Sequence, residues 1–111
     1  MAGKFELKKN DSGKFMFNLK AGNGKVILTS QLYRAKAAAL DGIESVKQHA
    51  ADDANFERKT STQGQPYFVL KAANRQVVGA SEMYTSPAAR EKGIASVKAH
   101  APDAVVVDLS V

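Results

Sequence analysis

The nine residues GIESVKQHA at positions 42–50 return as GIASVKAHA at positions 93–101, 51 residues further along a chain of 111 residues. Sliding the whole sequence by 51 aligns positions 5–50 with 56–101 without a gap, and 21 of the 46 aligned pairs are identical. Self-similarity on this scale indicates a duplicated structural unit. We therefore predict a single domain over residues 1–111, built from two repeats at about 5–55 and 56–111.

Within each copy the spacing of apolar residues changes from alternation to helical spacing, which predicts strands followed by a helix. The alternating stretches of the first copy are KFELKK (4–9), KFMFNLKA (14–21) and KVILTS (25–30). The helices should end at about His49 and His100. Ser86-Pro87 predicts a sharp start for the second helix, because serine caps free N–H groups and proline suits the first helical position.

The segment AVVVDLSV (104–111) follows the second helix, and the offset of 51 aligns its Val107, Asp108 and Leu109 with Phe56, Glu57 and Arg58. The strand after each helix therefore matches the strand that opens a repeat. We predict an α+β fold of two tandem β3-α-β repeats. They should form one largely antiparallel sheet, with both helices on one face and strands exchanged between the repeats.

The repeated glycines, Gly42 and Gly93, lie inside the predicted helices, where glycine costs roughly 0.5–1 kcal/mol relative to alanine. We expect a close approach of each helix to its symmetry mate or to the sheet to offset this cost. Asn23-Gly24 predicts a hairpin turn, since tight hairpins need positive φ angles. The second copy has Arg75 in place of the glycine, which predicts a different or looser turn there.

These residues resemble the small bacterial proteins of the YegP-like family. The resemblance rests on the Phe-Glu strand, the Leu-Lys-Ala strand end with Asn in the next turn, Ser and Tyr before the helix, and Gly-Ile-x-Ser-Val-Lys within it. It covers essentially the whole chain, twice. It implies two β3-α-β repeats with exchanged final strands and implies no activity; Arg58 and Arg75 depart from exact symmetry.

Composition narrows the classes of function. The chain has no cysteine, which excludes disulfides, thiolate metal sites and cysteine nucleophiles. We see no apolar run long enough for a signal peptide or a membrane span, and expect a soluble, cytoplasmic protein with no membrane partner. The net charge is +5, carried wholly by residues 1–51. A basic half suggests weak, sequence-tolerant nucleic-acid binding as an alternative function.

No residue set predicts catalysis or a cofactor. His49 and His100 occupy matching positions at the helix ends, where a metal site would need them to converge and a structural role needs only the helix dipole. Ser30, Ser81, Tyr33 and Tyr84 have no neighbouring base to activate them, and we interpret them as structural. We predict no metal, no cofactor and no enzyme.

The sheet face away from the helices is the candidate binding face, with Lys8, Lys20, Lys59, Tyr67 and Lys71 as its residues. We expect Glu6 and Glu57 to form cross-strand ion pairs with these lysines on a solvated surface, and Met16, Ile27, Val69 and Val78 to share the face. The prediction is a binding or structural module whose partner is unknown, with a protein partner through the apolar part of the face as one possibility. Exchanged strands satisfied within one chain predict a monomer, although an exposed strand edge could still pair with another chain.

Overall fold

The computed structural model describes residues 3–110 and contains seven strands, two helices and a short 3-10 turn. The first repeat contributes β1 (Lys4–Lys9), β2 (Phe15–Lys20), β3 (Val26–Thr29) and α1 (Lys36–His49). The turn η1 (Asp53–Asn55) leads into the second repeat, with β4 (Phe56–Thr60), β5 (Pro66–Lys71), β6 (Val77–Ala80) and α2 (Pro87–His100), and β7 (Val105–Asp108) closes the chain. The predicted helix ends at His49 and His100 are confirmed.

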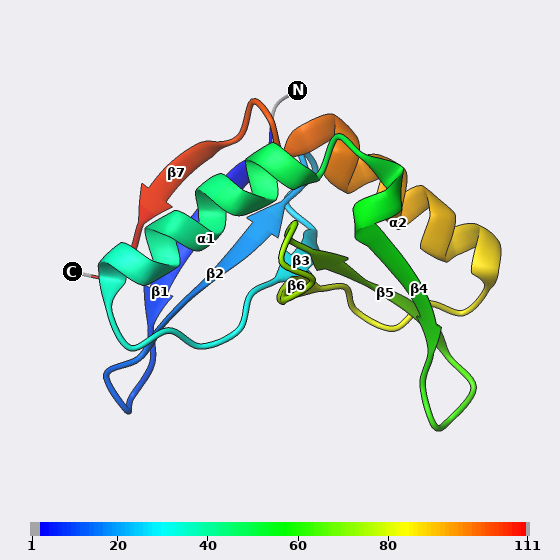
Figure 1. Ribbon diagram of the computed structural model, residues 1–111, viewed down its shortest axis with the longest axis horizontal. Coiled ribbons are helices and arrows are strands. Elements are labelled where there is room, and N and C mark those ends of the chain that lie inside the picture. The colour runs from blue at the N-terminus through cyan, green and yellow to red at the C-terminus, as the bar shows by residue number, and fades with distance from the viewer. Residues whose placement is uncertain (1–2, 111) are drawn as a thin grey trace.

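All seven strands form one sheet in the order β4-β5-β6-β3-β2-β1-β7. Every pairing is antiparallel except that of β7 with β1, which is parallel. Both helices pack against the one core that runs along the sheet, and in Figure 1 their C-terminal ends come together near the middle of the molecule. The predicted α+β fold with a largely antiparallel sheet and both helices on one face is confirmed.

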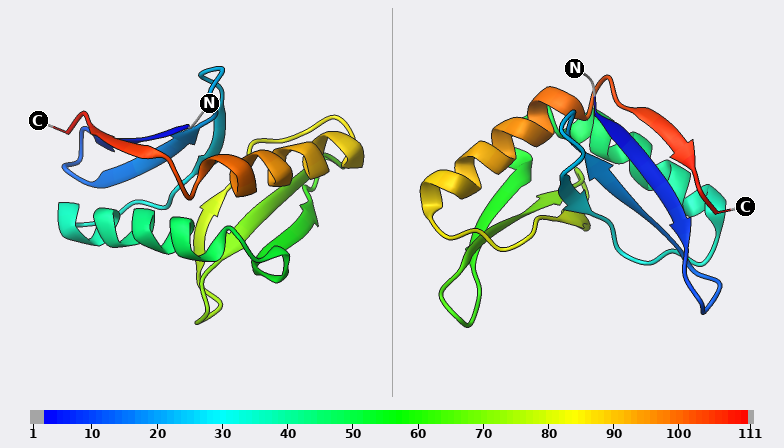
Figure 2. Two further views of the ribbon diagram at one scale, coloured as in Figure 1. Left: turned by 90° about the horizontal axis from the view of Figure 1, so that it is seen from above. Right: turned by 180° about the vertical axis from the view of Figure 1, so that it is seen from behind.

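Strand exchange is visible where each helix ends. The chain leaves α1, which lies over the first repeat, and enters β4 in the other half of the molecule. It leaves α2 and enters β7 beside β1 (Figure 2). Each helix therefore passes the chain to the opposite repeat, as the aligned strand sequences predicted.

The hydrophobic core lies between the helices and the sheet and runs through both repeats. Its fully buried side chains come in counterpart pairs, such as Phe17 with Phe68 and Val46 with Val97. A buried side chain of this size contributes about 1.5–3 kcal/mol relative to an exposed one. Because one core serves both repeats, neither repeat has a complete apolar interior of its own.

The helix glycines are explained by the tyrosine that precedes each helix. The Tyr33 ring stacks on Phe17 with ring centroids 6.3 Å apart. A Cβ atom at Gly42 would lie 2.5 Å from the Tyr33 hydroxyl oxygen and 3.1 Å from the Phe17 ring. Tyr84, Phe68 and Gly93 repeat this contact in the second copy. The close approach is thus to the sheet, and the tyrosine lies under the middle of the helix.

The centre of the sheet lies on the pseudo-twofold axis that relates the repeats. Thr29 pairs with Ala80 across β3 and β6, and these two residues are repeat counterparts. Leu28 and Gly79 are also counterparts, and a Cβ at Gly79 would lie 2.8 Å from Leu28 Cγ. Two leucines have no room at this axis, so one repeat provides the side chain and the other provides the space.

All four hairpins use the same five-residue turn. In each, the fourth residue donates its N–H to the carbonyl of the first, and the first donates to the carbonyl of the fifth. The fourth residue has a positive φ in every case, and it is Gly13, Gly24, Gly64 or Arg75. The prediction of a different turn at Arg75 is wrong, because Arg75 adopts φ 70° and keeps the hydrogen bonds that the glycine turns have.

A β-bulge corrects a second prediction. Leu19 pairs with Leu28 and Lys20 with Val26, so Ile27 is the extra residue of the bulge. The two bulge residues point to roughly the same side of a sheet, and both Ile27 and Leu28 belong to the core. Val78 is the matching bulge residue of the second repeat and is also in the core. Ile27 and Val78 are therefore not on the outer face.

Candidate binding surface

The outer face is the side of the sheet that faces away from the helices. A central row of six side chains crosses it, one from each strand from β1 to β6, because each residue is paired with the next across the ladder. In sheet order the central row is Glu6, Asn18, Thr29, Ala80, Val69 and Glu57. The half from the first repeat is polar, and the half from the second is apolar apart from its terminal carboxylate.

The polar half of the central row is unusually buried for a sheet face. Glu6 and Asn18 are each 7% exposed. The Asn18 amide donates a hydrogen bond of 2.9 Å to the Thr29 hydroxyl, which fixes both side chains across β2 and β3. The expectation of a solvated face is wrong for Glu6, because its neighbours on three sides shield it from water.

Three lysines surround the Glu6 carboxylate. Lys20 Nζ lies 2.9 Å from Glu6 Oε1, Lys8 Nζ 3.8 Å from the same oxygen, and Lys4 Nζ 3.4 Å from Oε2. The hydrogen bond from Lys20 is the main cause that holds the pKa of Glu6 below its ordinary value, although burial acts in the opposite direction. Glu6 is therefore a fixed anion that holds three ammonium groups on the outer face.

The second repeat contains a reduced copy of this cluster. Lys71 Nζ lies 2.6 Å and Lys59 Nζ 3.9 Å from Glu57 Oε1. The Lys71 hydrogen bond lowers the pKa of Glu57. The counterpart of Lys4 is Asn55, so this carboxylate holds two lysines and is more open to solvent.

The five predicted residues all lie on the outer face, in two separate groups. Lys8 and Lys20 flank Glu6, whereas Lys59 and Lys71 flank Glu57, and Tyr67 lies directly across the ladder from Lys59. The structure adds Lys4 to the first group. The alternation of β1 could have identified it, because Lys4 is two residues before Glu6 and on the same face.

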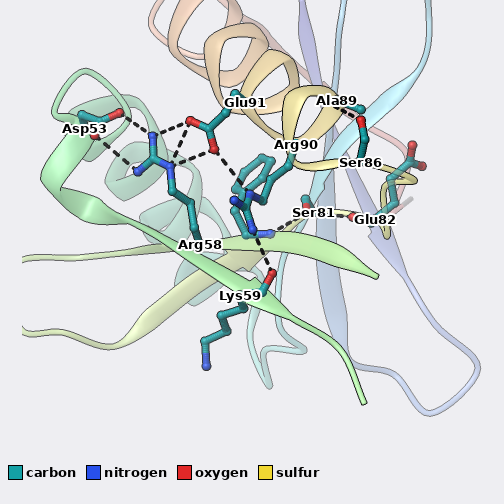
Figure 3. A network of polar contacts seen from close by, with 10 residues as sticks. Asp53, Arg58, Lys59, Ser81, Glu82, Ser86, Ala89, Arg90 and Glu91 are labelled. Atoms are coloured by element: carbon teal, nitrogen blue, oxygen red, sulfur yellow. Dashed lines mark hydrogen bonds and ion pairs between the residues drawn. The ribbon is translucent and has the colours of Figure 1, made fainter. Parts of the chain in front are cut away.

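Arg58 belongs to a separate ion-pair network on the helix side of β4, which the sequence did not predict (Figure 3). Its guanidinium donates to both carboxylate oxygens of Glu91 at 2.8–3.0 Å and to Asp53 at 3.1 Å. Lys98 Nζ lies 2.7 Å from Asp53, and Arg90 donates to the Lys59 carbonyl at 3.3 Å. The network joins β4 and η1 to α2.

The electrostatics of this network are those of a structural ion-pair cluster. Hydrogen bonds from Arg58 and then Lys98 lower the pKa of Asp53 to about 2, and Arg58 also lowers the pKa of Glu91. The carboxylates raise the pKa of Arg58 in return. All these groups stay charged near neutral pH, so the network stores no proton for acid-base chemistry.

The histidines have structural contacts. Nδ1 of His49 lies 2.8 Å from the Ser45 carbonyl, to which it donates, and Nε2 accepts the Ala73 N–H at 3.2 Å. His49 thus joins α1 to the β5–β6 turn of the other repeat. His100 makes the same Nδ1 contact with Ser96. Residues 3–110 contain no group of three or more carboxylate or histidine side chains arranged for a metal ion.

The serines before the helices complete the backbone ladder. Ser30 Oγ accepts the Phe17 N–H at 2.9 Å and donates to the Gln31 carbonyl at 2.7 Å. Ser81 makes the matching bonds with Phe68 and Glu82. Each hydroxyl accepts one hydrogen bond from the backbone and donates one to it, which agrees with a structural role.

Neither helix within residues 3–110 has the length and hydrophobicity needed to cross a membrane. A family model described as "Domain of unknown function (DUF1508)" matches residues 10–57 and again 61–108. The two matches correspond to the two repeats.

Bacterial relatives match over nearly their full length. The chain is 53% identical over 109 residues to the "UPF0339 protein in ptx operon 5'region" of Stutzerimonas stutzeri, with 98% of each chain covered. It is 50% identical over 108 residues to the "UPF0339 protein YegP" of Escherichia coli K12, covering 97% of this chain and 98% of the relative.

Two solution NMR structures have the same fold. The UPF0339 protein SO3888 from Shewanella oneidensis superimposes with a TM-score of 0.93 at 46% identity, covering 99% of this chain and 93% of the other. The E. coli protein yegP, described as of unknown function, superimposes with a TM-score of 0.94 at 49% identity, covering 99% and 95%.

Proposed function

This chain belongs to the bacterial UPF0339 (YegP) family with two DUF1508 domains, and on that premise we propose that it is a non-enzymatic module that binds an acidic segment of a partner protein on the outer face of its sheet. The observation that carries the proposal is the Glu6 cluster, in which one buried carboxylate holds three lysines. The Glu57 cluster repeats the arrangement with two more.

Charge complementarity supports an acidic partner. Five lysines and two glutamates leave positive charge in surplus on this face, and the glutamates fix where the ammonium groups lie before a partner arrives. Preorganised side chains lose less conformational entropy on binding. Ala80 and the 6%-exposed Val69 add no charge to the middle of this face, which separates the two lysine clusters.

A protein partner fits this face better than nucleic acid does. Binding of single strands relies on stacking of bases on aromatic rings, and Tyr67 is the aromatic residue that the strand alternation places here, since the phenylalanines of β1, β2, β4 and β5 point to the helix side.

The test measures fluorescence anisotropy of a labelled dodecamer of glutamate titrated with the protein at 50 and 200 mM salt. Lys8→Gln/Lys59→Gln should weaken binding by about five-fold, roughly 1 kcal/mol. The control Lys14→Gln/Lys92→Gln removes the same charge from the β1–β2 turn and from α2. Equal weakening in both double variants would contradict the proposal.

A labelled oligothymidylate serves as the competing probe. Binding tighter than that of the glutamate peptide, with a steep fall in affinity as salt rises, would favour the nucleic-acid alternative. The cytoplasmic location expected from the sequence stays a prediction, which fractionation of cells containing the tagged protein checks.

A further inference from the structure

The two edges of the sheet are built differently. β4 forms one edge, and the charged Arg58 cluster lies against it. β7 forms the other edge; Val105 and Val106 are exposed there and Val107 is partly exposed. Val105 is 61% exposed and Leu109 is 50% exposed, against 52% for the most exposed large apolar residue elsewhere in residues 3–110.

Arg58 opposes the pairing of another strand with the β4 edge. Its counterpart in β1 is Leu7, which is fully buried. Leu7 is covered by β7, where Asp108 is its partner in the strand pairing. No described strand covers β4 in the same way. A charged residue at the inward-facing position of an edge strand opposes pairing with another chain, so the arginine at position 58 suits the absence of a covering strand.

The β7 edge has one ion pair where the β4 edge has a network of charged residues. Asp108 is the one charged residue of the strand and has a single ion-pair partner, Lys36, whose Nζ lies 2.6 Å from Asp108 Oδ2, whereas Arg58 is joined to both Asp53 and Glu91 in a network. The Leu109 N–H donates to the Leu7 carbonyl at 2.7 Å, so Leu109 continues the strand geometry beyond Asp108. By alternation Val105, Val107 and Leu109 lie on the outer face, and Val106 and Asp108 on the helix side.

We propose that β7 is an interface for a second copy of this chain, which pairs with it antiparallel about a twofold axis at Val107. This register places Val107 opposite Val107 of the other copy and Val105 opposite Leu109. Six apolar side chains then form a continuous ladder on the outer face, and cross-strand apolar pairs are the units that stabilise sheets. The two Asp108 residues are each opposite Val106, so like charges do not face one another.

Because the two edges differ, pairing of β7 with β7 gives a closed dimer and not an open filament. If β7 of one copy paired with β4 of the next, the contact would be head-to-tail and would extend into a filament. The Arg58 cluster opposes that arrangement, whereas the β7–β7 contact uses both exposed edges and then stops. The paired segment is residues 105–109 of each copy, far fewer than the roughly 20–30 residues per partner of a standard complex, so the dimer should form at high protein concentration.

The experiment combines sedimentation equilibrium from 10 µM to 1 mM with isotope-filtered NMR on a mixture of labelled and unlabelled protein. The average mass should rise toward twice that of the chain, and intermolecular contacts should join the methyl groups of Val105 and Leu109. Val105→Lys should weaken dimerisation at least ten-fold. Leu32→Lys, at a site of similar exposure in the loop before α1, should leave it unchanged.

A constant monomer mass up to 1 mM would overturn the proposal, as would equal weakening by Leu32→Lys or intermolecular contacts confined to another surface. Arg58→Leu tests the role of Arg58 separately. In this variant species larger than a dimer should appear in sedimentation velocity, and their absence, with the wild-type dimer intact, would overturn the assignment of Arg58 as the group that keeps the pairing closed.

Discussion

At the residue scale, the hairpin turns show how backbone conformation and residue type are matched. Three of the four turns place glycine at the left-handed position, and the fourth places Arg75 there at φ 70°. A residue with a Cβ pays roughly 1–2 kcal/mol for this conformation. The hydrogen bonds of the turn, including that of the Gln76 N–H to the Asn74 side chain at 3.0 Å, hold Arg75 in place.

Arg75→Gly should therefore stabilise the protein by about 0.5–1 kcal/mol, because the left-handed strain is larger than the entropy that glycine adds to the unfolded chain. Urea unfolding measures the difference. Gly24→Arg at the counterpart position should lower stability by a similar amount. Opposite signs in the two variants are required, and a loss of stability in Arg75→Gly would show that the turn is unstrained.

Because of the Arg58 network, the free energy of unfolding should fall at acid pH. Arg58 and Lys98 lower the pKa of Asp53 from 3.8 to about 2 in the folded state. The resulting stability is complete above the unfolded-state pKa near 4 and is lost as pH falls through 2. Asp108 beside Lys36 has the same direction and range.

Asp53→Asn should thus flatten part of the fall in melting temperature between pH 5 and pH 2. The measurement is thermal unfolding of the variant and the wild type at half-unit pH steps. Asp52→Asn, one residue earlier and outside the ion-pair network, is the matched control. Identical pH profiles for the wild type and Asp53→Asn would show that the network adds nothing to stability.

At the element scale, each helix is held against the sheet by a glycine, a tyrosine and a phenylalanine. The repeat and the apolar spacing predict both the helices and the presence of a close contact at Gly42. They do not say that Tyr33 fills it, because the tyrosine is nine residues earlier and its ring returns under the helix only in the folded chain. The spacing of apolar residues within each segment was thus enough to predict the helices and strands, but not the contact between them.

Gly42→Ala should destabilise the protein by about 1–2 kcal/mol, although alanine is the better helix former. The added Cβ would lie 2.5 Å from the Tyr33 hydroxyl, and crowding in a packed core exceeds the gain in propensity. Urea unfolding measures the effect. In a Tyr33→Phe background the penalty should shrink, and an unchanged penalty there would place the crowding at Phe17 instead.

At the scale of the whole molecule, a twofold axis relates the two repeats, but the side chains that meet at this axis cannot be identical. Leu28 occupies space at the axis that its counterpart Gly79 leaves free. A sequence comparison records a leucine opposite a glycine as one mismatch among others. Only the β3–β6 pairing shows that the two residues share one volume.

Exchanging these two residues tests the shared volume. Leu28→Gly alone should cost roughly 2–5 kcal/mol through the cavity it leaves, and Gly79→Leu alone should cost at least about 1–3 kcal/mol through overpacking. The double variant should recover most of the loss, since the same side chain then enters from the other strand. A double variant as unstable as the sum of the single losses would contradict the shared volume.

The sequence by itself determined the duplication, the succession of strands and helices along the chain, the helix ends and the exchange of strands. Each of these depends on local periodicity or on the alignment of one segment with another. The lysines of the candidate face were also readable, because alternation fixes the side of a strand on which a residue lies.

The tertiary structure decided the features that depend on neighbours distant in the chain. A bulge between β2 and β3 places Ile27 in the core. Three lysines surround Glu6 and shield it from water. No described strand covers β4, so the charge of Arg58 lies at an open edge of the sheet. In each case the free energy comes from contacts between separate strands and helices, and a pattern within one segment carries no information about which segment will lie beside it.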